Sequence, residues 1–207
     1  MATNGIQETK EPIPDQKTLQ EAGQLEIKDK DGNKVPFLSL FTDKPAEQRQ
    51  LIILVRHFFC GSCEDYIKVL AKDLPPDVLS QHNIVLTVIG CGDSQFVESY
   101  AERTGCPYPI YCDPTQALFK KLSMVKTLAG SGKAASYHQR SFANIVATST
   151  WNALKSGPSV LMGKAGPSDQ NGGELLFQQG ELKWIHIMKN TVDHTSLPDL
   201  KAVLSIQ

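Results

Sequence analysis

The feature that most constrains this chain is a pair of cysteines between an apolar segment and a helical pattern. Residues 51–55, Leu-Ile-Ile-Leu-Val, form a continuous apolar run rich in β-branched residues, which is typical of a strand covered on both faces. Four residues later comes the motif Cys60-Gly61-Ser62-Cys63. Apolar residues then recur at helical spacing over residues 67–74, and two prolines end the helix. The sequence therefore predicts a CxxC motif at a strand-to-helix turn.

This placement of the CxxC motif predicts thiol–disulfide chemistry. A helix N-terminus presents unpaired N–H groups and a partial positive charge, and both favour a thiolate over a thiol. We expect Cys60 to be the nucleophile, because it is the more N-terminal and exposed cysteine, and Cys63 to resolve the adduct. Arg56 and His57 are candidate supporting residues that could stabilise the thiolate. A solvent-facing position for Arg56, and a backbone hydrogen bond for His57, are the alternatives.

The rest of the pattern alternates strands and helices. Residues 84–89 and 110–112 are predicted to form strands. The first is followed by a predicted helix that ends at Gly105, and the second by a predicted helix that begins at Pro114. A helix over about 141–154, a hairpin of residues 174–177 and 182–188, and a helix from about Thr195 follow. This order predicts an α/β fold with a central mixed sheet and helices on both faces.

The N-terminal part divides into a tail and a hairpin. Residues 1–23 are rich in Gln, Glu, Lys and Pro without an apolar period, which predicts a flexible tail. From residue 24 the pattern alternates, turns at residues 29–33 and resumes as an extended run over 35–41, which predicts a β-hairpin extension. We therefore expect a single domain over residues 24–207.

Composition narrows the possible partners. The 207 residues carry a formal net charge of −1, which gives no electrostatic reason to expect nucleic acid binding. No apolar run is long enough for a membrane span, and the start of the sequence lacks a secretory signal. Five cysteines, an odd number, do not fit a disulfide framework of a small secreted protein. These features together favour a cytoplasmic location, and the oligomeric state stays open.

Residues 56–63 resemble the start of the active segment of the peroxiredoxin-like 2 proteins, in the AhpC/TSA (alkyl hydroperoxide reductase/thiol-specific antioxidant) group. The likeness runs from about Leu51 to Leu204 and includes residues 85–90, 110–114 and 172–177, with Asp193-His194 near its end. It implies a thioredoxin-like fold and a redox CxxC. Such a dithiol needs no cofactor besides its own disulfide, and an external thioredoxin- or glutathione-type reductant would recycle it.

Two departures from the related families limit what the resemblance implies. Typical peroxiredoxins carry Pro-x-x-x-Thr-x-x-Cys, and neither Cys60 nor Cys63 fits this pattern. Thioredoxins place a cis-proline before the strand that corresponds to residues 174–177, where this chain has Gly172-Gly173. Gly173 is therefore a further candidate supporting residue, at a substrate-docking edge that differs from that of thioredoxins.

Three functions remain open on this basis. The first is a thiol-dependent oxidoreductase that reduces a small disulfide or oxidised substrate. The second is a reductase of peroxides or lipid endoperoxides, for which the apolar Phe58-Phe59 pair near the site could suit a lipid, although such aromatic residues more often pack in the core. The third is a non-catalytic binding module that uses the loops at residues 127–137 and 163–173.

The remaining cysteines and histidines favour structural roles. Cys91 follows the second buried strand and is either a third redox partner or, preferably, a buried free thiol. Cys106 and Cys112 are expected to pack in the core. No metal site is predicted, because a structural zinc site needs four ligands and no second CxxC or His-x₃₋₅-His accompanies the first motif. His186 and His194 are expected to be hydrogen-bonded strand or cap residues.

Overall fold

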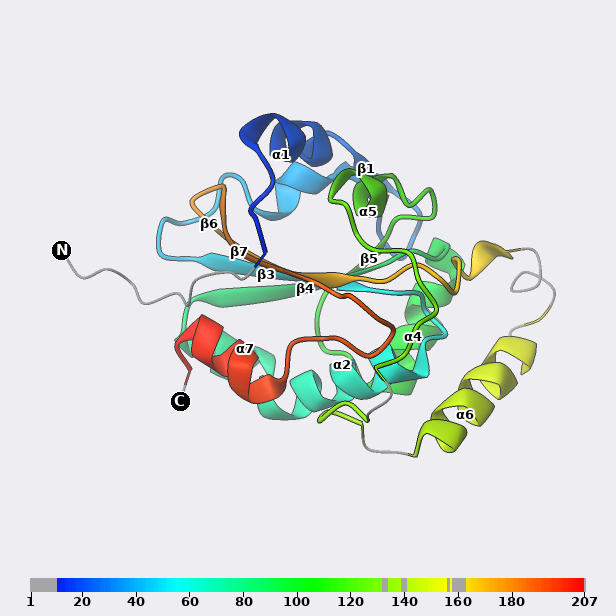
Figure 1. Cartoon of the computed structure of the whole chain (residues 1–207). Helices are drawn as coiled ribbons and strands as arrows, with labels where there is room; N and C mark the ends of the chain where they lie inside the picture. The colour runs from blue at the N-terminus through cyan, green and yellow to red at the C-terminus, as the bar shows by residue number, and fades with distance from the viewer. Residues whose placement is uncertain (1–10, 132–133, 139–140, 156, 158–162, 207) are drawn as a thin grey trace.

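A computed structural model of the protein describes residues 11–131, 134–138, 141–155, 157 and 163–206 (Figure 1). Its central element is a seven-stranded mixed sheet in the order β2-β1-β5-β4-β3-β6-β7. The elements, in chain order, are α1 (Gln16–Gly23), β1 (Glu26–Lys28), β2 (Lys34–Pro36), the 3-10 helix η1 (Phe37–Leu40), β3 (Arg49–Val55), α2 (Gly61–Asp73), α3 (Pro76–Gln81), β4 (Ile84–Gly90), the 3-10 helix η2 (Ser94–Phe96), α4 (Val97–Thr104), β5 (Ile110–Cys112), α5 (Ala117–Lys121), α6 (Phe142–Lys155), β6 (Gly173–Gln178), β7 (Glu181–Ile187) and α7 (Leu197–Leu204).

Strand β3 lies inside the sheet and ends at the CxxC motif. It pairs in parallel with β4 and antiparallel with β6, and every one of its residues is buried. Parallel pairing continues from β4 to β5, and β1 joins β5 antiparallel. The carboxyl ends of β3, β4 and β5 therefore meet at one edge, where α/β proteins form their sites.

Helices cover both faces of the sheet, as the sequence predicted (Figure 1). On one face Leu51 and Ile53 pack with the apolar residues of α2, α4 and α7. On the other face Ile52 and Leu54 pack with α1, η1 and α5. This alternation along β3 is what a strand buried between two layers requires.

The predicted flexible tail is wrong for residues 16–23, which form helix α1. Asp15 caps this helix by accepting the Thr18 backbone N–H at 2.6 Å. Ala22 is fully buried, and Leu19 packs beside it against the apolar residues on the Ile52 and Leu54 face of the sheet. A cap and two apolar contacts are enough to stabilise a short helix against an existing core. They produce little apolar periodicity in the sequence from which the helix could be predicted. The first ten residues lie outside the described part of the chain.

The predicted hairpin is confirmed for β1 and β2, but its second strand is shorter than expected. Pro36 lacks an N–H for further pairing, and residues Phe37–Leu40 turn into η1 instead of extending to residue 41. The helix expected from Pro114 begins at Ala117, because the Asp113 carboxylate accepts the Leu118 N–H at 2.8 Å. Of the loop at residues 127–137, positions 132–133 lie outside the described residues.

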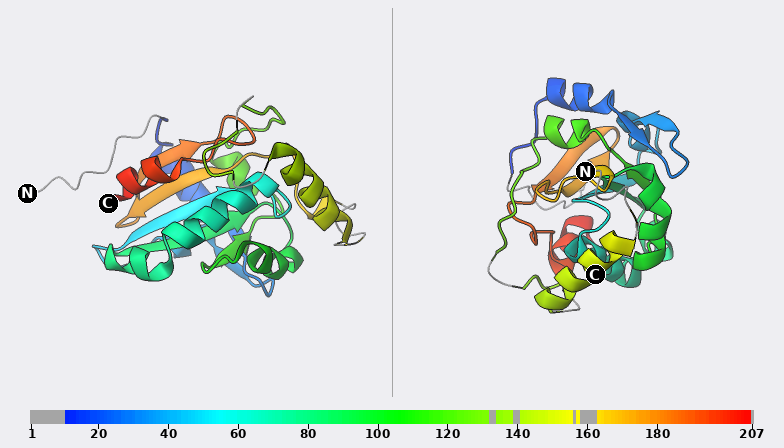
Figure 2. Two further views of the ribbon diagram at one scale, coloured as in Figure 1. Left: turned by 90° about the horizontal axis from the view of Figure 1, so that it is seen from below. Right: turned by 90° about the vertical axis from the view of Figure 1, so that its right-hand side faces the viewer.

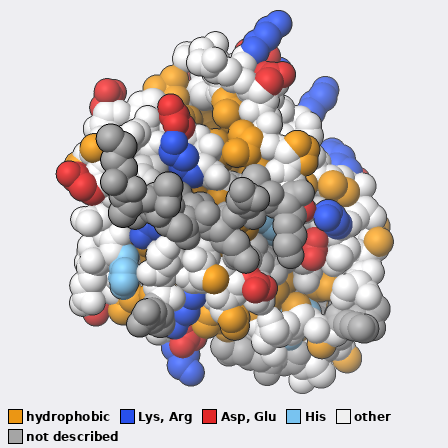
Figure 3. Space-filling view, turned by 60° about the vertical axis from the view of Figure 1, so that its left-hand side comes forward, with side chains coloured by type: hydrophobic (Ala, Val, Ile, Leu, Met, Phe, Trp, Pro, Cys, Tyr) orange, Lys and Arg blue, Asp and Glu red, His pale blue; other side chains and the backbone are white. Residues whose placement is uncertain are grey.

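The molecular surface carries acidic and basic side chains intermingled on the face shown in Figure 3. Among the described residues, no helix has the length and apolar character that a membrane crossing needs.

Candidate active site

The loop between β3 and α2 holds the CxxC motif in a fixed position. Phe58 is fully buried, and its ring packs on Gly90. A Cβ atom at position 90 would lie 2.5 Å from this ring, so only glycine leaves room for it. The Phe59 ring packs edge-on against Phe96 at 5.1 Å. The two rings wedge the loop between β4 and η2. They belong to the core, as expected of such aromatic residues, and do not face a lipid.

Cys60 and Cys63 are brought into direct contact at the start of α2. Cys60 is the N-cap residue, and its sulfur accepts the Cys63 backbone N–H at 3.3 Å. The Cys63 thiol donates to the Cys60 sulfur across 2.8 Å, and both residues are free thiols. The pair is therefore a reduced dithiol in which Cys63 donates two hydrogen bonds to the Cys60 sulfur, one from its backbone N–H and one from its thiol.

Arg56 supplies the positive charge of the site. It is buried, which excludes the solvent-facing alternative, and its Nη1 lies 3.2 Å from the Cys60 sulfur. Its Nε donates to the Gln170 carbonyl at 3.3 Å, and its Nη2 donates to the Ser168 carbonyl. These carbonyls hold the guanidinium group in place and bring the segment before β6 against the dithiol.

His57 lies beside the motif in a different role. It is half-buried, and its Nδ1 accepts the Phe59 backbone N–H at 3.4 Å. Burial lowers the pKa of His57, which favours the neutral ring. The structure thus gives His57 the backbone hydrogen bond that was one of its two predicted roles.

The surroundings push the pKa values of the two cysteines in opposite directions. Burial alone would raise the pKa of Cys60, but hydrogen bonds from Cys63 and the charge of Arg56 lower it well below its ordinary value. Burial, the hydrogen bond to Cys60 and the adjacent thiolate raise the pKa of Cys63 well above its ordinary value. At neutral pH this arrangement favours a Cys60 thiolate beside a protonated Cys63.

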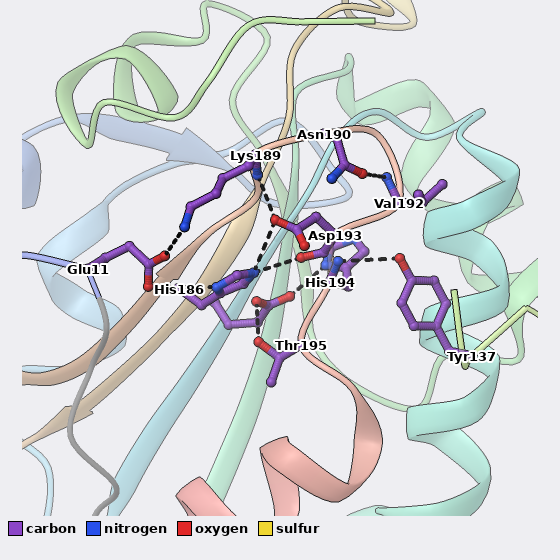
Figure 4. A network of polar contacts seen from close by, with 10 residues as sticks. Glu11, Tyr137, His186, Lys189, Asn190, Val192, Asp193, His194 and Thr195 are labelled. Atoms are coloured by element: carbon purple, nitrogen blue, oxygen red, sulfur yellow. Dashed lines mark hydrogen bonds and ion pairs between the residues drawn. The ribbon is translucent and has the colours of Figure 1, made fainter. Parts of the chain in front are cut away.

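Sequence analysis missed two buried residues beside Cys63. His194 Nε2 lies 3.5 Å from the Cys63 sulfur, and His194 Nδ1 lies 2.5 Å from Oε1 of Glu174. Both side chains are fully buried. Figure 4 shows the hydroxyl of Tyr137 pointing toward His194, whose backbone N–H it accepts. The one available signal was a carboxylate inside an apolar strand, because a buried charge requires a partner.

Gly173 and its neighbour Gly172 allow the strands to approach closely. A Cβ at Gly172 would lie 2.7 Å from the Leu54 carbonyl carbon, and one at Gly173 would overlap the backbone of His186. The described residues contain no cis peptide bond. Gly173 therefore acts through backbone spacing at the edge where thioredoxins place a cis-proline, and it has no side chain to contact the sulfurs.

The other three cysteines are separate from the dithiol. Cys91 is buried, and its thiol donates to the Arg56 carbonyl. Burial raises the pKa of Cys91 far above its ordinary value, that of Cys106 to about 11 and that of Cys112 to about 12. These thiols are held protonated at neutral pH. Within the described residues, no three His, Cys, Asp or Glu side chains gather in a way that could hold a metal ion.

Helix α6 and the segment at residues 134–138 cover the dithiol. A Cβ at Gly61 would lie 2.5 Å from Ser149 Oγ and 2.7 Å from Ile145 Cγ2, so α6 packs directly on the first turn of α2 (Figure 2). Ser62 Oγ and His138 Nε2 are 2.8 Å apart. Cys60 is only 4% exposed, which corrects the expectation of an exposed nucleophile.

Comparison with known proteins agrees with this fold. Residues 70–190 match the AhpC/TSA antioxidant enzyme family. The chain is 31% identical to human (Homo sapiens) peroxiredoxin-like 2C over 187 residues, which covers 89% of this chain and 79% of the relative. The Takifugu rubripes protein of the same name is 29% identical over 186 residues, with 87% of this chain and 79% of the relative covered.

Two solved structures share the fold at low sequence identity. Peroxiredoxin Q of Xanthomonas campestris superposes with a TM-score of 0.52 at 10% identity, covering 95% of this chain and 94% of the other. A peroxiredoxin-like protein from Aquifex aeolicus gives a TM-score of 0.54 at 10% identity, with coverage of 87% and 81%. From its family match and its relatives, the chain belongs to the AhpC/TSA antioxidant enzyme family of thioredoxin-fold proteins, as a peroxiredoxin-like protein, and this membership supports a thiol-dependent redox role.

Proposed function

We propose that the protein is a dithiol oxidoreductase in which Cys60 attacks and Cys63 resolves. The observation that carries this proposal is the 2.8 Å approach of the two sulfurs with their pKa values shifted in opposite directions. A nucleophile must be a thiolate, and the second thiol must stay protonated so that it does not compete with the first.

The reaction proceeds in two displacements on a disulfide substrate RS–SR′. The Cys60 thiolate forms a bond to one substrate sulfur, the S–S bond breaks, and R′S⁻ leaves with the electron pair. Cys63 then bonds to the Cys60 sulfur, loses its proton, and releases RS⁻. The substrate gains two electrons, and the protein ends with a Cys60–Cys63 disulfide. An external thioredoxin- or glutathione-type reductant returns the disulfide to the dithiol.

Trapping the intermediate tests this function. In a Cys63→Ser variant mixed with a small disulfide, a stable adduct should accumulate on Cys60, seen by mass spectrometry of the intact protein and its peptides. A Cys60→Ser variant should form no adduct, and Cys106→Ser, in which a half-buried thiol is replaced, should react like the wild type. Equal adduct formation in the Cys60→Ser variant would reject Cys60 as the nucleophile, and the absence of an adduct in the Cys63→Ser variant would reject the dithiol mechanism and favour the binding module.

Peroxide reduction is a second candidate, favoured by the antioxidant family to which the chain belongs. Here the Cys60 thiolate attacks a peroxide ROOH, takes one oxygen to become a sulfenic acid, and releases ROH after protonation. Cys63 then forms the disulfide with loss of water. A sulfenic-acid trap on the Cys63→Ser variant treated with hydrogen peroxide separates the two, because the disulfide reaction alone leaves no sulfenic acid.

A further inference from the structure

The resolving cysteine lies next to a histidine–carboxylate pair, His194 and Glu174, that has no role in the two displacements described above. His194 Nδ1 is 2.5 Å from Glu174 Oε1, and the second carboxylate oxygen accepts the Thr195 hydroxyl at 2.9 Å. A carboxylate can only accept, so Nδ1 carries the proton and Nε2 presents its lone pair. That lone pair is 3.5 Å from the Cys63 sulfur. Glu174 thus fixes the tautomer that can receive a proton from this thiol.

The imidazole ring is held from several elements of the fold. The Tyr66 ring of α2 stacks on it, with centroids 4.3 Å apart and planes 6° apart. The Tyr137 hydroxyl accepts the His194 backbone N–H at 3.3 Å (Figure 4). Glu174 comes from β6, and His194 follows β7. A ring positioned in this way approaches the sulfur without a rotamer search, which is what an acid–base group requires.

The proton of Cys63 has different acceptors before and after the first displacement. In the reduced protein the thiol donates to the Cys60 sulfur, the better acceptor while it is an anion. Once Cys60 is part of a mixed disulfide, its sulfur is neutral and accepts weakly. Among the described contacts of the Cys63 sulfur, Nε2 of His194 is then the remaining acceptor. The first displacement therefore turns the thiol toward the histidine.

We propose that His194, positioned by Glu174, is the general base of the resolving step. The proposal rests on the dithiol function proposed above. As the Cys63 sulfur bonds to Cys60, its proton moves to Nε2 and the Cys60–substrate bond breaks, with the electron pair leaving on RS⁻. When an external dithiol later reduces the Cys60–Cys63 disulfide, Cys63 leaves as a thiolate and takes this proton back, by microscopic reversibility.

The other titratable groups near Cys63 do not serve as the base. Burial raises the pKa of Tyr66 well above its ordinary value, and it does the same for Tyr137, so both phenols stay protonated. Arg56 is a cation beside Cys60 and has no lone pair to offer. Cys60 itself is consumed in the mixed disulfide.

Methyl methanethiosulfonate tests the proposal, because its small methylthio group suits a covered thiol. The reagent transfers this group to Cys60, and resolution by Cys63 releases methanethiol. Acid-quenched samples followed by mass spectrometry give both rates. In His194→Asn the methylthio adduct should form at the wild-type rate and decay about 100-fold or more slowly. Glu174→Gln, which keeps the shape of the carboxylate, should slow the decay less. His82→Asn, at the far end of the sheet, should match the wild type.

The pH dependence separates a base from a structural residue. Without the base, resolution depends on spontaneous loss of the Cys63 proton, so the rate in His194→Asn should rise about tenfold per pH unit and approach the wild type in alkali. A structural defect would slow resolution equally at every pH. If the adduct forms and both His194→Asn and Glu174→Gln resolve it like the wild type at each pH, His194 is not the general base and the dithiol mechanism stands. If the wild type forms no adduct, the dithiol mechanism itself fails, and the general-base role of His194 fails with it.

Discussion

At the scale of single residues, Arg56 supplies the positive charge that, after the hydrogen bond from Cys63, lowers the pKa of Cys60 most. Three of its donor groups have partners: two backbone carbonyls and the sulfur. Burial would lower the pKa of Arg56, but the neighbouring Cys60 charge raises it, so the guanidinium stays charged. A fixed cation in a low-dielectric site acts more strongly on a thiolate than a solvated one.

Replacing Arg56 by methionine should therefore raise the pKa of Cys60. The loss of the charge and of one hydrogen bond is expected to move it upward by roughly 1–3 units. The rate of iodoacetamide alkylation of the Cys60 peptide, measured against pH, reports this shift. Arg49→Met is the matched control, because Arg49 is also buried but lies at the opposite end of β3. An unchanged alkylation profile in Arg56→Met would show that the helix terminus and Cys63 suffice.

The sequence was informative for one half of the site and silent for the other. Arg56, Cys60 and Cys63 lie within one strand-to-helix turn, so local pattern and thiol chemistry could identify them. Glu174 and His194 are 20 residues apart, and His194 is 131 residues from Cys63. The antiparallel pairing of β6 with β7 and of β6 with β3 brings them together. Such long-range contacts leave no spacing in the sequence, and only the carboxylate in an apolar strand indicated a buried partner.

At the scale of elements, helix α6 packs over the start of α2, beside the dithiol. It contacts the first turn of α2, where Gly61 leaves room for Ile145 and Ser149. Its outer side is exposed and carries apolar residues, with Trp151 59% and Leu154 63% exposed. A helix that buries only part of its apolar surface is held weakly, because the gain from packing is small.

A Gly61→Ala substitution should loosen this cover. The added methyl group would overlap Ser149 and Ile145, and overpacking of this kind costs about 1–3 kcal/mol. If the strain falls on the docking of α6, alkylation of Cys60 should accelerate about tenfold or more. Gly130→Ala is the control, since a Cβ there meets nothing within 4 Å. Slower alkylation of Cys60 in the Gly61→Ala variant would contradict a covering role for α6.

The elements that the sequence predicted well are those with strong periodicity. Strands β3 and β4 and the β6–β7 hairpin were expected within a few residues, because apolar β-branched runs bounded by turns have few alternatives. Helix α4 ended as expected at Gly105, whose φ of 62° favours glycine. Helix α1 was missed because tertiary packing, and not its own pattern, stabilises it.

At the scale of the whole molecule, the cysteines link stability to pH. In the reduced folded protein Cys60 has lost its proton at pH values where the unfolded chain, with a thiol pKa near 9.0, still holds it. The unfolded state then binds more protons, so the stability of the folded state rises with pH. Above that value the sign reverses, because the buried thiols with raised pKa values keep protons that the unfolded chain releases.

The reduced protein should accordingly gain stability as the pH rises from the lowered folded pKa of Cys60 toward 9.0, with a slope of at most about 1.4 kcal/mol per pH unit. The stabilisation from Cys60 is complete above pH 9 and is lost as the pH falls through its folded pKa. Urea unfolding in reducing buffer at several pH values measures the slope. Cys60→Ser should flatten it and Cys106→Ser, whose thiol pKa is raised to about 11, should keep it. An identical slope in both variants would show that titratable groups other than Cys60 cause the pH dependence.

The two outer strands of the sheet, β2 and β7, carry features that oppose pairing with a strand of another chain. Strand β2 ends in Pro36, which has no N–H to donate, and Lys34 beside it pairs with Glu26 at 2.7 Å. On β7, Lys183 pairs with Glu181, and the nearby Lys189 pairs with Glu11 at 3.3 Å. A proline and charged pairs discourage another chain from adding a strand at either margin. The margins of the sheet are thereby protected against β-type aggregation.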